Sequence, residues 1–90
     1  LHLKPEHFQT LINLGNALLR NGQLDAGIKY YSVALQIDPN DADLCNNLGV
    51  ALTMKKNMNG AIFYFRKALE INPEFDAAHK NLLKALKKEN

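Results

Sequence analysis

Apolar residues recur at three- and four-residue steps along most of this chain, which is the spacing of one face of a helix. Phe8, Leu11 and Leu14 show this spacing in the first such segment. The pattern predicts a helix that begins at Pro5, since proline suits the first turn of a helix. It predicts the end of that helix at Gly22, because glycine takes the left-handed C-terminal conformation without a steric clash.

The same period predicts four further helices. The second ends before Pro39 and the fourth before Pro73, because proline cannot continue a helix. The fifth is expected to begin near Glu74. The connections are only a few residues long, so successive helices should be antiparallel neighbours. No segment shows the alternation of a strand.

The ends of the third helix use different residues. Asn40 and Asp41 are expected to cap its first turn with side-chain oxygens. Its other end lacks a counterpart of Gly22. Lys56 or Asn57 must therefore close that turn, and asparagine is better suited to a left-handed backbone.

An internal repeat underlies these helices. Residues 13–18 (NLGNAL) recur 34 residues later as 47–52 (NLGVAL), and more weakly as 81–86 (NLLKAL). Residues 1–5 (LHLKP) likewise match 35–39 (LQIDP). A fixed period of this length indicates a repeat array. Because the first residues read as the end of a helix, we expect the chain to be an excerpt from a longer array.

The repeated positions resemble the tetratricopeptide repeat, whose 34-residue unit is a helix-turn-helix. The resemblance divides the chain into the tail of a preceding repeat (1–7), two full repeats (8–41 and 42–75) and the first helix of a third, acting as a C-terminal cap (76–90). The residues that carry it are Leu14, Gly15, Leu18, Tyr31, Ala34, Pro39, Leu48, Gly49, Leu52, Ala61, Phe65, Ala68 and Pro73.

The resemblance implies an all-α fold, a right-handed superhelical stack of antiparallel helix-turn-helix repeats with about five helices. Gly15 and Gly49 are expected where the first helix of a pair meets the second, since a Cβ would hold the helices apart. Tyr31 and Phe65 are expected to fill the space between pairs, and Leu14 and Leu48 are expected to pack inward. Leu83 stands in the glycine position, which is tolerable because no second helix follows it in this chain.

In this family the first helices line a concave groove. Asn13, Asn47 and Asn81 form a ladder there, and a carboxamide can pair with both groups of a peptide backbone unit. A similar ladder in the O-linked N-acetylglucosamine transferases holds extended polypeptide. Alternatively, the asparagines serve only the fold or solubility. The implied groove residues are Gln9, Asn13, Asn16, Arg20, Asn46, Asn47, Val50, Met54, Lys80, Asn81 and Lys84.

The groove residues bear on two kinds of charged ligand, a terminal carboxylate and an acidic segment. Family members that read chaperone tails hold a terminal carboxylate with basic residues and asparagines, but Ile12, Ala77 and Asn81 replace the basic members here. This disfavours that mode. A set of lysines makes one end of the groove basic, either as a solvated helix end that complements the dipole or as an attraction for an acidic ligand. These lysines are Lys80, Lys84, Lys87 and Lys88.

Composition narrows the function classes. Ninety residues form one small domain, and a net charge of +2 is too small to indicate nucleic acid, for which aromatic stacking platforms are also missing. No apolar run is long enough to span a membrane. Cys45 is the only cysteine, which fits a cytoplasmic setting, and we expect it to be buried and inert. The histidines lack ligand spacing, so no metal or cofactor is expected.

We therefore expect a binding protein and no enzyme, since no nucleophile–base set or phosphate loop is present. The first hypothesis is a scaffold for protein–protein interaction that binds a peptide or protein segment in the groove. The alternative is a homo-oligomer formed through exposed end faces, with Leu1 and Leu3 at one end and Leu82, Leu83 and Leu86 at the other. A passive spacer remains a third option.

Overall fold

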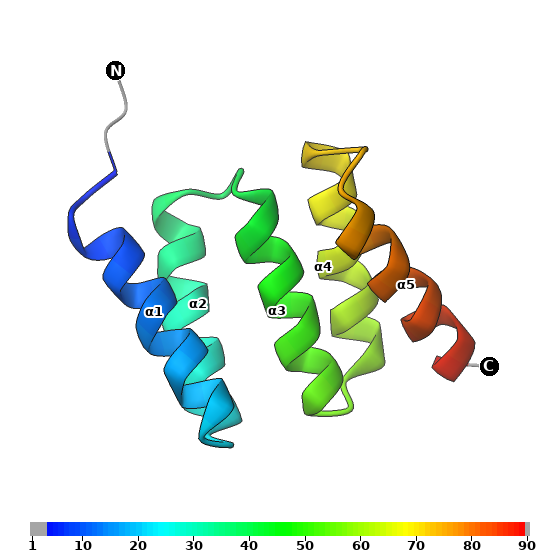
Figure 1. Ribbon diagram of the computed structural model, residues 1–90, viewed down its shortest axis with the longest axis horizontal. Coiled ribbons are helices and arrows are strands. Elements are labelled where there is room, and N and C mark those ends of the chain that lie inside the picture. Colours follow the sequence, from blue (N-terminus) through cyan, green and yellow to red (C-terminus); the bar gives the residue numbers. More distant parts are fainter. Residues whose placement is uncertain (1–3, 90) are drawn as a thin grey trace.

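The computed structural model describes residues 4–89, which form five α-helices and no strand. They are α1 (His7–Arg20), α2 (Leu24–Ile37), α3 (Ala42–Met54), α4 (Met58–Ile71) and α5 (Asp76–Glu89). Successive helices run antiparallel, with α1, α3 and α5 in one layer and α2 and α4 behind them (Figure 1). This slab measures 41 × 30 × 17 Å. The expected all-α helical repeat fold is confirmed.

Two helix boundaries differ from the sequence prediction by two residues. Helix α1 begins at His7, not at Pro5, and α5 begins at Asp76, not near Glu74. Pro5 still forms a turn that leads into α1, since its carbonyl oxygen accepts a hydrogen bond from the backbone N–H of Phe8 at 2.9 Å. Boundary shifts of this size are common where the first turn is irregular.

The cap of α3 is built by Asp41 alone. Its Oδ1 accepts a hydrogen bond from the backbone N–H of Leu44 at 3.0 Å, as expected. Asn40, the second expected cap, instead donates its backbone N–H to Oδ1 of Asp38 at 3.1 Å. The loop before α3 is thus fixed by two aspartates.

The turn after α3 is closed by Lys56, one of the two residues expected there, although asparagine was expected to suit the left-handed backbone better. Lys56 has φ +64°, matching Gly22 at φ +79° in the same place of the preceding repeat. Asn57 is used otherwise, because its Oδ1 caps α4 by accepting the backbone N–H of Gly60 at 3.0 Å. The capping role keeps Asn57 out of the left-handed region and leaves that conformation to a lysine.

Each glycine of a first helix receives an aromatic ring from the second helix of its pair. A Cβ added at Gly15 would lie 2.6 Å from ring carbons of Tyr31, and one at Gly49 would lie closer still to Phe65. Both rings are only 2% exposed. The expected close approach of the paired helices at these glycines is therefore confirmed.

The hydrophobic core is distributed between neighbouring helices. One cluster joins α1, α2 and α3, a second joins α3, α4 and α5, and a third places Cys45 against Ala68 and Ala78. Ala34, Ala61 and Ala68 are fully buried. Cys45 is buried as expected, and burial raises the pKa of its thiol.

The two leucines at equivalent repeat positions differ in burial. Leu48 is 1% exposed because it packs between helices of the first cluster, whereas Leu14 is 42% exposed. In the described part of the chain no helix precedes α1 to cover Leu14, so the prediction that it packs inward is wrong. Leu83 on α5 is 60% exposed. The end-face residues Leu1 and Leu3 lie outside the described residues.

Candidate binding groove

The layer formed by α1, α3 and α5 carries two hollows that meet at Val50. The α1–α3 hollow has a volume of about 370 Å³ and the α3–α5 hollow about 330 Å³. We refer to the two together as the groove. The α1–α3 hollow is lined by Asn16, Leu19, Arg20, Tyr31, Asn47, Val50 and Met54. The α3–α5 hollow is lined by Val50, Thr53, Met58, Phe65, Asn81, Lys84, Ala85, Lys87 and Lys88.

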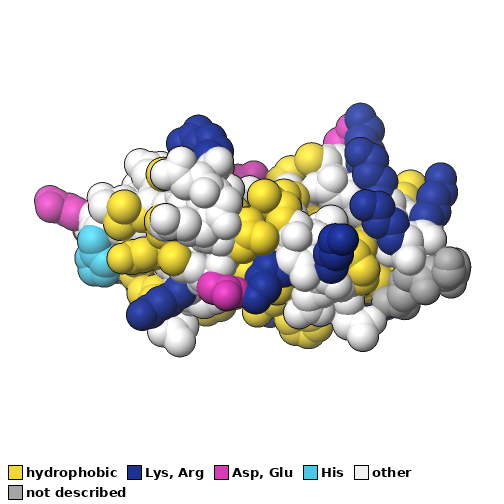
Figure 2. Space-filling model, turned by 90° about the horizontal axis from the view of Figure 1, so that it is seen from below, with side chains coloured by type: hydrophobic (Ala, Val, Ile, Leu, Met, Phe, Trp, Pro, Cys, Tyr) yellow, Lys and Arg dark blue, Asp and Glu magenta, His cyan; other side chains and the backbone are white. Residues whose placement is uncertain are grey.

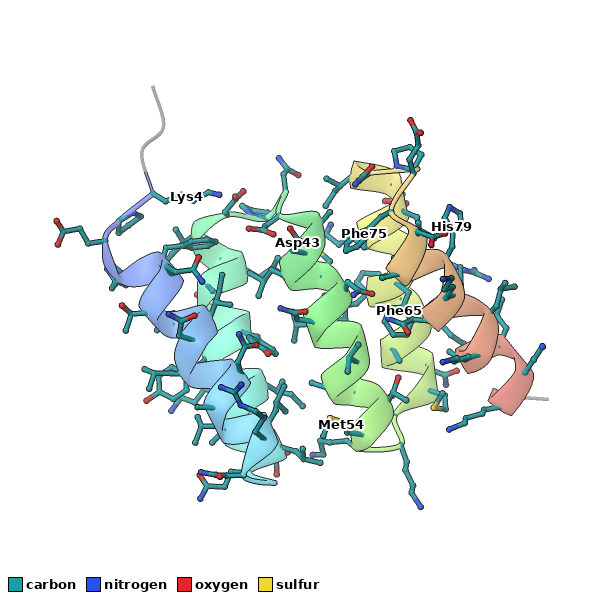
Figure 3. All side chains as sticks on the ribbon, viewed as in Figure 1. Lys4, Asp43, Met54, Phe65, Phe75 and His79 are labelled. Carbon is teal, nitrogen blue, oxygen red and sulfur yellow. The ribbon has the colours of Figure 1, made fainter. Side chains whose placement is uncertain are left out.

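Side chains from the second helices form the floor of each hollow, a role that was not among the sequence predictions. Tyr31 of α2 lies beneath the first hollow, and Phe65 of α4 lies between α3 and α5 beneath the second (Figure 3). Both rings reach this layer because Gly15 and Gly49 leave room for them. These two glycines were the signal in the sequence that could have identified the floor residues.

Asn16 holds the floor of the α1–α3 hollow in place. The hydroxyl of Tyr31 donates a hydrogen bond to Oδ1 of Asn16. Burial raises the pKa of Tyr31, so its hydroxyl stays protonated near neutral pH and remains the donor. The carbonyl oxygen of Asn16 is thereby engaged, whereas its amide NH2 donates no hydrogen bond to a described residue.

The three ladder asparagines have different surroundings. Asn47 lines the α1–α3 hollow, and its carboxamide makes no hydrogen bond to another described residue. Asn81 lines the α3–α5 hollow and donates from Nδ2 to Oδ1 of Asn46 at 3.1 Å. Asn13 is exposed, lines neither hollow and accepts a hydrogen bond from Gln9 at 3.2 Å. Of these three, only Asn47 therefore presents to the groove a carboxamide that bonds to no other described residue.

Asn46 was expected on the groove surface, but only 9% of it is exposed. Helix α5 covers this position, where the amide of Asn81 satisfies the Asn46 oxygen. A buried carboxamide needs such a partner, which makes the pair a joint between α3 and α5.

The basic residues divide into lining and peripheral groups. Lys84, Lys87 and Lys88 line the α3–α5 hollow, and Lys87 was not among the predicted groove residues. Lys80 lines neither hollow and pairs with Asp76 one turn earlier, at 3.3 Å. Figure 2 shows dark blue Lys and Arg side chains gathered toward the end of the molecule that α5 forms.

Among the described residues, no group of three or more His, Cys, Asp or Glu side chains is placed to hold a metal ion. None of the described helices combines the length and apolarity that crossing a membrane requires.

Solved structures similar to this chain include two with bound peptide. The first TPR of Spaghetti (RPAP3) bound to HSP90 peptide SRMEEVD has a TM-score of 0.87 and 22% identity, over 94% of this chain and 68% of that one. The second TPR of the same protein, bound to the same peptide, has a TM-score of 0.86 and 17% identity, over 91% of this chain and 76% of that one. A chain of the APC/C hetero-tetramer Cut9-Hcn1 has a TM-score of 0.86 and 29% identity, over 89% of this chain but only 15% of that one.

Family models agree with this likeness. A tetratricopeptide repeat model matches residues 42–75, and a TPR repeat model matches residues 15–56. A search of curated protein sequences gives no significant match. Two models of one repeat type together cover residues 15–75, and the helices stack as in solved TPR domains. The chain belongs to the tetratricopeptide repeat family.

Proposed function

We propose that this protein is an interaction scaffold that binds an extended segment of another polypeptide in the groove. The observation that carries the proposal is that the two hollows adjoin, since Val50 lines both, and that α1, α3 and α5 supply most of their lining. Two structures of similar fold hold a peptide from HSP90. Binding of a peptide or protein segment is therefore the function that both the surface and the likeness support.

Apolar contact supplies part of the binding energy in this proposal. Val50 is 37% exposed and Met54 47% exposed, although both lie on the groove side of α3. Burying apolar surface contributes about 25 cal/mol per Å² removed from water. A ligand chain that covers these two side chains therefore gains binding free energy from the burial of each. Methionine also adapts its shape to different ligand side chains.

Asn47 supplies the polar part. Its carboxamide lies half-exposed beside Val50 and carries one acceptor and two donor hydrogens. A peptide unit in extended conformation presents the matching N–H and C=O groups. Asn47 thus fixes the register of the ligand backbone without reading its side chains, while Asn16 and Asn81 each contribute the half of the carboxamide that is not already bonded.

A ligand held mainly by its terminal carboxylate is disfavoured. Ile12 and Ala77 stand where the chaperone-tail readers have basic residues, and Ile12 packs against the first core cluster. Without those cations a buried terminal carboxylate would lack its countercharge. The proposal is therefore for an internal segment of the partner.

The test is a selection from a displayed library of random peptides of about twelve residues. Val50→Gln fills the junction of the two hollows with a polar side chain, and Val33→Gln makes the same change on α2, where the valine is equally exposed at 38%. We expect the selected peptides to lose at least tenfold in affinity for Val50→Gln and to bind Val33→Gln like the unchanged protein. Peptides that bind all three proteins equally would overturn the proposal.

A second candidate function, self-association, rests on exposed leucines at both ends of the helix stack. Leu14 on α1 is 42% exposed and Leu83 on α5 is 60% exposed. Apolar surface at the end of a repeat stack favours contact with another copy. Sedimentation velocity over a concentration series tests it. A shift toward dimer that Leu83→Gln removes supports this function, and a monomer at every concentration excludes it.

A further inference from the structure

We infer that the groove takes an acidic polypeptide segment, which places an apolar side chain in the α3–α5 hollow and its carboxylates against the lysines of α5. This inference rests on the proposed function and specifies the chemistry of the ligand. It concerns side-chain carboxylates of the ligand and requires no free C-terminus.

The interior of the α3–α5 hollow is apolar. Val50, Met58 and Phe65 line it, together with the methyl group of Ala85. The hydroxyl of Thr53 also lies there but already donates to the carbonyl oxygen of Gly49 at 2.9 Å. A charged or strongly polar ligand group would lose its hydration in this hollow without gaining a partner. The hollow therefore suits an aliphatic or aromatic side chain.

The rim of the same hollow is strongly basic. Lys84, Lys87 and Lys88 line it, no acidic residue with a described side chain does, and the structure shows no ion pair from these three lysines to any described side chain. By contrast, Lys80 on the same helix pairs with Asp76. These three like charges around one apolar hollow, with no carboxylate partner among the described side chains, repel one another. Carboxylates of a ligand would relieve that repulsion and speed association.

Most of the positive charge lies at one end of the groove. The α1–α3 hollow has a single cation, Arg20, beside the neutral carboxamides of Asn16 and Asn47. The ligand is therefore expected to carry more carboxylates where it crosses α5 than where it crosses α1. This asymmetry also determines which end of the ligand segment lies over α5.

A polypeptide fits this surface better than a nucleic acid. Single strands bind through aromatic side chains on which successive bases stack. The aromatic rings beneath the groove, Tyr31 and Phe65, are each only 2% exposed and present no face for stacking. Lysines beside an apolar hollow instead match an acidic residue next to an apolar one.

The experiment uses the peptides from the random library that require Val50 but not Val33. Fluorescence anisotropy measures their affinity for Lys84→Glu/Lys87→Glu and for Lys29→Glu/Arg66→Glu, a control with the same charge change at exposed positions on α2 and α4. We expect the groove-dependent peptides to be enriched in Asp and Glu beside Leu, Ile, Met or Phe. We expect the Lys84→Glu/Lys87→Glu variant to bind these peptides at least tenfold more weakly than the unchanged protein at about 50 mM salt. This difference in affinity should decrease at higher salt, because salt screens the charges. The control should bind them less than threefold more weakly.

Each outcome separates this inference from the proposed function. Groove-dependent peptides without acidic enrichment, or equal losses in both charge variants, overturn the inference and leave the function intact. The absence of any groove-dependent peptide overturns both. A labelled thymidine oligonucleotide that binds as tightly as the peptides, and is lost with the α5 variant, also overturns the inference. Lys84→Gln/Lys87→Gln provides a milder variant, with circular dichroism and melting as folding checks.

Discussion

The ring of Phe65 occupies the space that a side chain at position 49 would need. A Cβ at Gly49 would meet three carbons of this ring, all within 2.9 Å. Tyr31 stands in the same relation to Gly15 in the preceding repeat. One contact thus determines how closely the helices of a pair approach and which ring forms the floor of the adjoining hollow.

Gly49→Ala should destabilise the fold by about 2 kcal/mol, since overpacking a well-packed core costs about 1–3 kcal/mol. The helix propensity of alanine offsets part of this cost, because alanine is favoured over glycine by about 1 kcal/mol. Urea unfolding measures the change. Phe65→Leu removes the ring, so in that background the cost of Gly49→Ala should fall, as a double-mutant cycle reveals. An unchanged urea midpoint for Gly49→Ala would contradict the close packing.

Lys56→Gly should stabilise the protein by about 0.5–1 kcal/mol. Lys56 has φ +64°, and a left-handed backbone costs a residue with a Cβ about 1–2 kcal/mol. Glycine avoids that strain but loses more chain entropy on folding, which reduces the gain. The reciprocal change, Gly22→Lys, places a lysine at φ +79° in the preceding repeat and should destabilise by a similar amount. Urea midpoints that move in the same direction for both variants would refute the argument.

Stability should depend on Asp38 at acidic pH. The hydrogen bond from Lys4, at 2.9 Å between Nζ and Oδ2, lowers the pKa of Asp38 below its ordinary value of 3.8. A carboxyl whose pKa is lower in the folded state stabilises the fold above its unfolded pKa, and this contribution disappears as pH falls through the folded value.

The variant Lys4→Met removes the cation and should therefore unfold at lower urea than the unchanged protein at pH about 6. The difference between the two should shrink as pH falls below about 4, where Asp38 becomes protonated. Chemical unfolding at a series of pH values measures it. A difference that persists undiminished at the lowest pH would assign the effect to the contact of Lys4 with the Phe8 ring instead.

The fold could be predicted from the sequence because each repeat marks its own packing. Gly15 and Gly49 recur with the ring partners that fill the space beside them, and Pro39 and Pro73 follow the ends of α2 and α4. Such positions depend on neighbours within one repeat, so a fixed period reveals them. The residue that closes the turn after α3 stayed open between Lys56 and Asn57 because Asn57 suits two roles, and only the structure shows that it caps α4 and leaves the turn to Lys56.

The site was less predictable because groove exposure depends on contacts between repeats. Asn46 and its equivalents Ile12 and Lys80 share one repeat position, yet Asn46 is buried, Ile12 half-buried and Lys80 exposed. What differs is the helix beside each: α5 covers Asn46, and no described helix covers Lys80 in the same way. A pattern within one repeat therefore cannot rank the members of the asparagine ladder.

Asn47→Ala should lower the affinity for groove-dependent peptides about five- to tenfold, because it removes a hydrogen bond worth about 1–1.5 kcal/mol. Its carboxamide bonds to no described residue, so helicity and melting temperature should stay unchanged. Asn13→Ala is the matched control, because Asn13 holds the same repeat position but lines neither hollow, and it should leave affinity unaltered. Isothermal titration with selected peptides and a thermal melt of each variant measure both properties. A lower melting temperature for Asn47→Ala would show that Asn47 stabilises the fold. An equal loss of affinity in both variants would show that Asn13 contacts the ligand as well as Asn47.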